Sequence, residues 1–297
     1  KTTMKRCLKQ SAKAANVTAP IPRTIKKSES PHYMQTDPKS WTKIIGQPDA
    51  EDWEKARQKE ADGFDEPDLP KPKIIRLHED KVPADATILK GQNVFTYKWQ
   101  SVNGELILSK RKVRTCANNT WSGRATYSAT VAFTALLILL TIAAVLDYDV
   151  WLADIKQAYL STWLPPNHPA IYMRPPKEMR RHLKEVWQLL VVVYGLEEAG
   201  RLFYLSIRKI LKEFGFTESI IYSATYLVAK YANHEGVIYL ATHVDDMFMT
   251  FRKWFVMRKL AGCTFLESHD VWVLFATKRS ISCRQNKCIQ RMVSYIT

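Results

Sequence analysis

The sequence has few cysteines and no internal repeats. Its five cysteines are scattered and odd in number, and none belongs to a Cys-x-x-Cys motif: Cys7, Cys116, Cys263, Cys283 and Cys288. This distribution argues against a zinc site and a paired disulfide framework, so we expect reduced thiols in an intracellular protein. No signal-peptide pattern opens the chain, and its first residue is Lys, so we expect it to be cut from a longer protein.

Acidic residues are also scarce relative to basic ones. The chain has 29 Asp and Glu against 44 Lys and Arg, a formal net charge of +15. Such an excess suits a polyanionic partner, most often nucleic acid, although a basic globular protein without such a partner remains an alternative. With 297 residues and 46% hydrophobic content, the chain can bury a core in one large or two ordinary domains.

One long uncharged run raises the question of a membrane. Residues 125–146 hold 22 residues without a charge, which is enough to span a bilayer. Ser, Thr and Tyr dilute the run, and its strongly apolar part, 131–146, has only 16 residues. We therefore predict a buried core helix and no membrane partner, with a membrane anchor through 131–146 as the alternative.

The first 48 residues have the composition of a flexible linker. Eight Lys or Arg precede Pro31, against the single acid Glu29. So few apolar residues cannot order a segment, and we predict a basic flexible arm over 1–48.

Regular elements are predicted from residue 49 onward. We expect a helix over 49–64, a Pro-rich connector over 67–72, and a hairpin over 94–117 that turns at Asn103-Gly104. A buried strand should end near Asp154, and the helix over 199–214 should be capped by Gly215. Two strands around an Asn-His-Glu-Gly turn at 233–236 lead into 238–251, and 271–285 suggests a further hairpin. The order strand, helix, strand, strand over 149–251 resembles a ferredoxin-like split βαβ core, an α+β arrangement.

The segment IYLATHVDDMFMTF, residues 238–251, places two adjacent carboxylates inside an apolar hairpin. Burying Asp245 and Asp246 side by side costs several kcal/mol unless the charges are compensated. In the predicted topology Asp154 faces this hairpin, and three converging carboxylates would suit Mg²⁺. The alternative is an ordinary turn, because Asp favours turns for local reasons.

Six segments carry a resemblance to one family, and their order and spacing agree with it from about Trp53 to Ile296. They are HVDDM, DIKQAYL, YGLEEAGRLFY, IYMRPP, KVRTCA and TYSATV. Together they resemble the reverse transcriptases of copia-type LTR retrotransposons, whose catalytic hairpin reads Tyr-x-Asp-Asp.

The resemblance implies a right-hand polymerase fold with fingers and a ferredoxin-like palm over 49–255, and the start of a thumb over 256–297. It implies that Asp154, Asp245 and Asp246 hold two Mg²⁺ ions, or Mn²⁺ in their place. The nucleotide-binding residues would be Lys112, Arg114, Tyr159 and Glu198.

Alternatives stay open for several of these residues. Lys110 or Arg111 could be the triphosphate contact instead of Lys112 or Arg114, and the basic strand could simply be solvated. Tyr159 could be a core aromatic instead of lying under the sugar. Arg201 matches a family position and is interpreted as structural.

The implied reaction is RNA-directed DNA synthesis by nucleotidyl transfer to a primer 3′-hydroxyl. The implied partners are a primed RNA or DNA template, deoxynucleoside triphosphates and the integrase, ribonuclease H and protease domains of a Pol polyprotein. The expected location is the cytoplasm, in a virus-like particle, or the nucleus.

The sequence also departs from the family pattern. The family's Lys-Gln pair is Glu197-Glu198 here, and a carboxylate beside a triphosphate is electrostatically unfavourable. Gly200 stands in place of Pro, and His243 in place of Tyr. Ala132 and Leu137 stand at positions where the family usually has Arg. These changes favour a second hypothesis, a catalytically decayed remnant that still binds nucleic acid.

Overall fold

The computed structural model describes residues 25–66, 69, 71–118, 125–155, 157–231, 234–251 and 271–276. They form a mixed α+β structure with two sheets, so the α+β prediction is confirmed at that level. The chain divides into two compact units: unit 1 comprises 1–120 and 163–196, and unit 2 comprises 121–162 and 197–297. Residues 1–24 of the predicted arm, most of the predicted thumb, and every cysteine except Cys116 lie outside the described residues.

Unit 1 contains a five-stranded sheet in the order β1-β6-β5-β2-β3. Its strands are β1 (Ile74–His78), β2 (Ile88–Val102), β3 (Glu105–Asn118), β5 (Ile171–Arg174) and β6 (Glu185–Leu189). Its helices are α2 (Trp41–Ile44) and α3 (Ala50–Asp62), with short 3-10 turns at Lys27–Glu29, His32–Met34, Glu79–Lys81 and Lys177–Met179.

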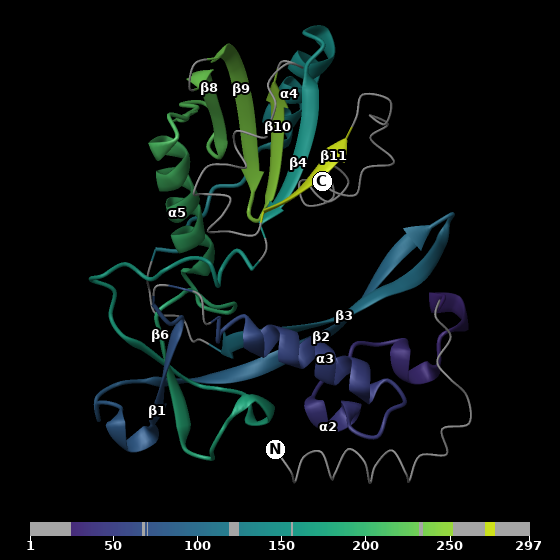
Figure 1. Ribbon diagram of the computed structural model, residues 1–297, viewed down its shortest axis with the longest axis vertical. Coiled ribbons are helices and arrows are strands. Elements are labelled where there is room, and N and C mark those ends of the chain that lie inside the picture. Colours follow the sequence, from purple (N-terminus) through teal and green to yellow (C-terminus); the bar gives the residue numbers. More distant parts are fainter. Residues whose placement is uncertain are drawn as a thin grey trace. The chain divides into compact units, whose positions relative to one another are not determined.

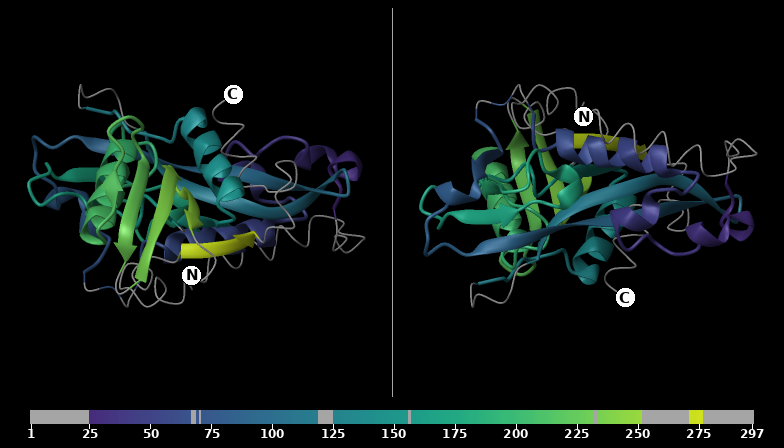
Figure 2. Two further views of the ribbon diagram at one scale, coloured as in Figure 1. Left: turned by 90° about the horizontal axis from the view of Figure 1, so that it is seen from above. Right: turned by 90° about the horizontal axis from the view of Figure 1, so that it is seen from below.

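The longest strands of unit 1, β2 and β3, form the predicted hairpin. Asn103 and Gly104 both have positive φ, 50° and 84°, as a two-residue hairpin turn of type I′ requires. The predicted helix over 49–64 is α3, which lies along this hairpin (Figures 1 and 2). It buries Trp53 against Phe95 and Tyr97 of β2, so the hairpin has an apolar core on one face.

The structure differs from the predicted arm over residues 25–48. Met34, Trp41 and Ile44 are 1%, 8% and 1% exposed and pack in the same cluster as Trp53. Met34 ends a three-residue 3-10 turn, and Trp41 and Ile44 belong to the four-residue helix α2, so these elements are too short to show a periodic pattern in the sequence.

Unit 2 contains a six-stranded sheet in the order β11-β4-β10-β9-β8-β7. Its strands are β4 (Asp149–Ile155), β7 (Thr217–Glu218), β8 (Thr225–Tyr231), β9 (His234–His243), β10 (Asp246–Phe251) and β11 (Val271–Ala276). Its helices are α4 (Phe133–Val145) and α5 (Ala199–Glu213). Of the hairpin predicted over 271–285, β11 is described and pairs with β4, and the rest lies outside the described residues.

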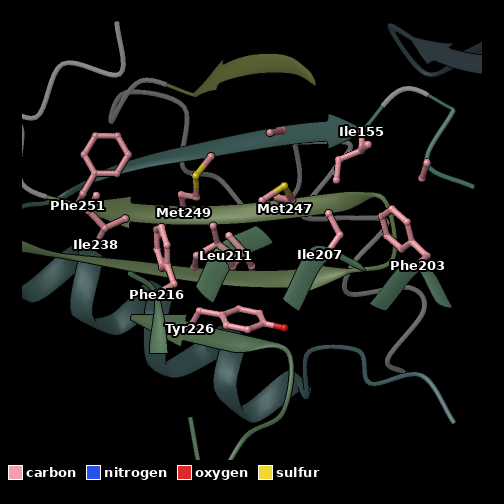
Figure 3. Packing of buried hydrophobic residues seen from close by; sticks show 13 residues of the cluster. Ile155, Phe203, Ile207, Leu211, Phe216, Tyr226, Ile238, Met247, Met249 and Phe251 are labelled. Carbon is pink, nitrogen blue, oxygen red and sulfur yellow. The ribbon is translucent and has the colours of Figure 1, made fainter. Parts of the chain in front are cut away.

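Each face of this sheet packs against one helix. On one face, Ile155, Met247 and Met249 contact the α5 stripe that includes Phe203 and Ile207 (Figure 3). On the other face, Val150, Leu152 and Phe248 contact Leu136 and Leu139 of α4 together with the neighbouring alanines. Successive strand residues point to opposite faces, so the parity of a residue number decides which helix it meets.

Helix α5 ends as the sequence predicts. Gly215 has φ 84°, its N–H donates to the Lys212 carbonyl, and the Phe216 N–H donates to the Leu211 carbonyl, both at 2.9 Å. This pair of bonds is the Schellman arrangement, which favours glycine at that position.

Helix α4 is buried on one side only, which differs from the predicted buried core helix. Leu137, Ile138 and Val145 are 46%, 44% and 75% exposed, whereas Leu136 and Leu139 are buried. None of the helices in the described ranges has the length and apolar character needed to cross a bilayer.

Candidate active site

Asp154 and Asp246 lie directly opposite each other on neighbouring strands. Antiparallel pairing of β10 with β4 sets Asp246 against Asp154 and Phe248 against Leu152. The Ile155 N–H donates to the Asp245 carbonyl at 2.8 Å, which makes the next pair, Asp154 and Asp246, the closely spaced kind without ladder hydrogen bonds. Cβ atoms in such a pair are roughly 5 Å apart, so the sequence prediction that the strand brings Asp154 to the hairpin agrees with this register.

Both carboxylates lie on the sheet face that packs against α4. Val150, Leu152 and Phe248 share this face and pack under α4, and Asp154 and Asp246 continue the same two rows. Asp246 is only 4% exposed, while Asp154 is half-buried. The apolar rows therefore hold two charged groups in a fixed register.

Asp245 lies in the two-residue turn that joins β9 to β10. The first turn residue, Val244, has φ 53°, a conformation that costs a β-branched residue roughly 1–2 kcal/mol. Val244 also packs against the core on the α5 side of the sheet. The turn is thus held in a strained conformation by its surroundings, as is common at functional sites.

His243 borders the same pair of strands, opposite Asp246 on β9. Burial lowers the pKa of His243, and the nearby charges of Asp246 and Asp245 partly oppose this shift. Burial therefore favours the neutral form of the imidazole.

The donor chemistry of the aspartate pair fits a hard divalent cation. Mg²⁺ is typically held by one or two carboxylates, with water and substrate phosphates as its other ligands. Across the described parts of the chain, no three or more His, Cys, Asp or Glu side chains form a metal-holding group. The structure accordingly brings Asp154 and Asp246 together, without Asp245 as a third member of a preformed cluster.

Tyr159 follows β4 and packs as a half-buried aromatic. Its ring meets Phe203 of α5 edge to face, with centroids 6.0 Å apart, beside the α5 core. This contact agrees with the core-aromatic alternative, and the nucleotide role of Tyr159 stays a prediction.

The predicted triphosphate contacts lie on β3 in unit 1. Lys112 pairs with Thr96 and Arg114 with Val94, on the hairpin face opposite the buried Val113. The Arg114 guanidinium lies 5.1 Å from the Tyr194 ring centroid. These two cations are half-buried and share a face with the exposed Lys110.

Arg111, one of the two alternative triphosphate contacts, forms ion pairs within unit 1 instead. Its Nε donates to Asp49 Oδ2 at 2.8 Å and its Nη1 pairs with Asp52 at 3.0 Å. The Arg111 side chain is 9% exposed and that of Asp49 is fully buried, so Arg111 is committed to the core face. Of the two alternatives, only Lys110 remains available to a ligand.

Glu60 is a neighbour of Lys112 and Arg114 to which the sequence assigned no role. Its carboxylate accepts the Thr115 N–H at 2.8 Å. Burial raises the pKa of Glu60, and this hydrogen bond and the charges of Lys112 and Arg114 oppose the rise. The helical spacing of Trp53, Arg57 and Glu60 puts Glu60 on the inner face of α3. This spacing is the sequence feature from which a contact of Glu60 with the hairpin could have been predicted.

Glu198 is the residue immediately before α5, and Glu197 precedes it. A carboxylate at a helix N-terminus interacts favourably with the helix dipole. Gly200 follows in the first turn, where its carbonyl accepts a hydrogen bond from Ser128 Oγ at 3.0 Å. Arg201 reaches the Tyr127 carbonyl at 3.5 Å, a weak contact in keeping with a structural interpretation.

The positions where the family usually has Arg differ in their surroundings. Ala132 is the residue before α4, and Leu137 lies on the exposed side of that helix. Neither residue places a positive charge near the aspartate pair.

Comparison with known proteins supports the resemblance to reverse transcriptases. The family model described as reverse transcriptase (RNA-dependent DNA polymerase) matches residues 81–261, more than half of the chain. That range contains every predicted site residue.

Three curated retrotransposon proteins are similar in sequence. The retrovirus-related Pol polyproteins from transposons RE1 and RE2 of Arabidopsis thaliana are 25% and 27% identical over 173 residues, which is 57% of this chain and 11% of each polyprotein. The polyprotein from transposon TNT 1-94 of Nicotiana tabacum is 26% identical over 235 residues, 76% of this chain and 16% of that protein. The chain thus matches between a tenth and a sixth of the length of these relatives. The chain belongs to the reverse transcriptase (RNA-dependent DNA polymerase) family, in its copia-type retrotransposon branch.

Proposed function

We propose that this chain is an RNA-directed DNA polymerase that extends a primer with deoxynucleotides. The observation that carries the proposal is the register of β4 and β10, which opposes Asp154 and Asp246 beside the turn that holds Asp245. Two opposed carboxylates, of which Asp246 is buried and Asp154 half-buried, repel each other, and a cation-dependent reaction supplies a reason for keeping them.

The proposed reaction is an in-line displacement. The primer 3′-hydroxyl loses its proton to solvent as its oxygen forms a bond to the α-phosphorus of the incoming nucleotide, the bond from that phosphorus to the bridging oxygen breaks, and pyrophosphate leaves. Asp154, Asp245 and Asp246 would hold two Mg²⁺ ions, or Mn²⁺ in their place. When bound, these ions stabilise negative charge on the attacking and leaving oxygens.

The protein's own part is mainly positioning. Lys112 and Arg114 would donate charge-assisted hydrogen bonds to the triphosphate oxygens. Tyr159 would lie under the deoxyribose, where its ring would exclude a 2′-hydroxyl. Glu198 would stand beside the incoming nucleotide, where its charge opposes binding. Fixed geometry of this kind supplies a large part of the rate enhancement in phosphoryl transfer.

We assign the fingers to unit 1, the palm to unit 2 and the start of the thumb to the chain beyond residue 255. The basic excess of the chain, +15, supports a primed RNA or DNA template as the macromolecular ligand. The Pol polyproteins that the chain resembles support integrase, ribonuclease H and protease domains as covalent neighbours.

Primer extension on an RNA template with Mg²⁺ and four deoxynucleotides tests the proposal, with Asp246→Asn as the inactive control. The proposal expects extension by the parent and none by the variant. Equal extension by both would refute the role of the pair.

A binding-only remnant is the second candidate, and Glu197 and Glu198 favour it. It expects salt-dependent binding of primer–template by the parent and by Asp246→Asn, with extension by neither. Glu198→Gln separates the two readings further: a gain of extension in that variant supports a polymerase limited by charge, and continued inactivity supports the remnant.

A further inference from the structure

The β2–β3 hairpin extends beyond the rest of its sheet as a ribbon with two open edges. β2 pairs with β5 only over Ile88, Leu89 and Lys90, and β3 is the last strand of the sheet. From Gly91 onward, no other named strand in the described part of the chain pairs with either of them, and β3 has isolated bridges from Ile107 to Lys26 and from Cys116 to Tyr194. A two-stranded ribbon is marginally stable alone, and its outward N–H groups need acceptors.

A segment upstream of the sheet, residues 25–47, supplies some of these acceptors, and we refer to it as the strap. The Leu108 N–H on the outer edge of β3 donates to the Ile25 carbonyl at 2.8 Å. Lys26 bridges to Ile107 and pairs with Glu105 at 2.8 Å. The strap also places Met34, Trp41 and Ile44 in the core beneath the ribbon.

Asp37 of the strap holds the other edge of the ribbon. Its Oδ1 accepts the backbone N–H of Tyr97 at 2.7 Å. Tyr97 lies one residue before Lys98, after which the register of the ladder becomes irregular. On β3, Glu60 accepts the Thr115 N–H in the same way, so a side-chain carboxylate occupies each edge.

The Asp37 contact lies next to the proposed triphosphate contacts in the ladder. Lys112 pairs with Thr96, the neighbour of Tyr97, and Arg114 pairs with Val94. Lys112 is paired with Thr96, so a change of backbone twist at residues 96–97 would also turn the backbone of Lys112. The direction of the Lys112 side chain would change with it. Asp37 acts at the strand edge, away from the face that carries Lys112 and Arg114.

We propose that Asp37 is a positioning residue for nucleotide binding, through which the strap holds the ribbon in the orientation that aims Lys112 and Arg114 at a triphosphate. The inference rests on the proposed function, which gives these two cations their ligand. The strap precedes residues 81–261, the range that the family model matches.

Binding of inorganic tripolyphosphate to the full chain, measured by calorimetry, tests the inference without needing catalysis. Asp37→Ala removes the acceptor, and we expect its dissociation constant to rise about three- to tenfold, the effect of losing one hydrogen bond. Asp37→Asn keeps a carbonyl oxygen at the same place and should bind within about twofold of the parent. Glu105→Ala is the matched control, because it removes a strap-contacting carboxylate in an exposed ion pair of small energetic value.

A second readout separates positioning from general stability. In primer extension, Asp37→Ala should raise the KM for the deoxynucleotide and leave kcat within about twofold, since the aspartate pair is untouched. Amide exchange should increase over 95–99 in Asp37→Ala and stay unchanged in α5.

Three results would overturn the inference: parent-like tripolyphosphate binding by Asp37→Ala, an equal loss in Asp37→Asn, or no tripolyphosphate binding by the parent. The outcomes for polymerisation are distinct. If tripolyphosphate binding follows the expected order and no primer is extended, the polymerase proposal fails and the positioning role stands. If the parent and Asp37→Ala extend primers equally well at deoxynucleotide concentrations below the KM of the parent, the positioning role fails alone.

Discussion

Asp246→Asn is expected to stabilise the metal-free protein. Asp246 is 4% exposed and lies opposite Asp154 in a closely spaced pair, with Cβ atoms roughly 5 Å apart. Two unit charges at about 5 Å repel by roughly 3 kcal/mol at an effective dielectric constant of about 20. Asn has nearly the same shape and no charge, so the free energy of unfolding should rise by about 1–3 kcal/mol at pH 8 in the presence of a chelator.

Urea denaturation followed by circular dichroism, with EDTA and with Mg²⁺, measures this effect. Mg²⁺ that binds the folded state should stabilise the parent by mass action and should stabilise Asp246→Asn much less. Asp149→Asn is the matched control, because Asp149 lies on the same strand opposite Phe251 and should change stability by less than about 0.5 kcal/mol. A variant less stable than the parent in EDTA, or equal Mg²⁺ stabilisation of both proteins, would refute the reasoning.

Four further predictions concern other parts of the molecule. Asp49→Ala should lower the free energy of unfolding by about 2–3 kcal/mol in urea denaturation, because it removes the buried partner of Arg111 and leaves Asp52, which is 45% exposed, as its ion partner. Burial alone would raise the pKa of Glu185, but hydrogen bonds from Trp187 and from the Arg181 N–H, and the Arg76 guanidinium, leave it below its ordinary value. The stabilisation from Glu185 is therefore complete above the unfolded-state pKa of about 4.3, and it is lost as the pH falls through the lowered folded-state pKa. Below about pH 5, the free energy of unfolding of Glu185→Gln should depend less on pH than that of the parent. Gly195→Ala should prevent soluble expression or lower the melting temperature by more than about 10 °C, because φ is 84° and an added Cβ would clash with the Ala117 carbonyl oxygen. Glu198→Gln should lower the KM for deoxynucleotides in primer extension and cost about 0.5 kcal/mol of stability at the α5 N-terminus.

The local elements could be predicted from the sequence because each has a strong periodic or turn signal. The Asn103-Gly104 turn, the α5 stripe ending at Gly215 and the β9–β10 hairpin are all confirmed by the structure. In each case the decisive residues are neighbours in sequence, so local physical chemistry is sufficient.

Long-range pairings could not be predicted in the same way. β1, β5 and β6 are short strands, and β1 pairs with β6, which is distant from it in sequence. In the sequence, β5 and β6 come between β4 and α5 of unit 2, but they belong to unit 1. The core role of Met34 and Trp41 likewise depends on where Phe95 and Tyr97 lie in space. For the site, the sequence predicted that Asp154 would face Asp246, but the burial of Asp246 and the commitment of Arg111 to Asp49 required coordinates.

Incorporation of a single nucleotide opposite a defined base of an RNA template is the decisive test of RNA-directed polymerase activity that depends on Asp246. The parent chain is mixed with primer–template, Mg²⁺ and one deoxynucleotide at a time, alongside an EDTA control and Asp246→Asn. We expect the primer to grow by one residue only with the complementary deoxynucleotide, only with Mg²⁺ and only in the parent. Failure of the parent to extend a primer to which it is bound would contradict the account.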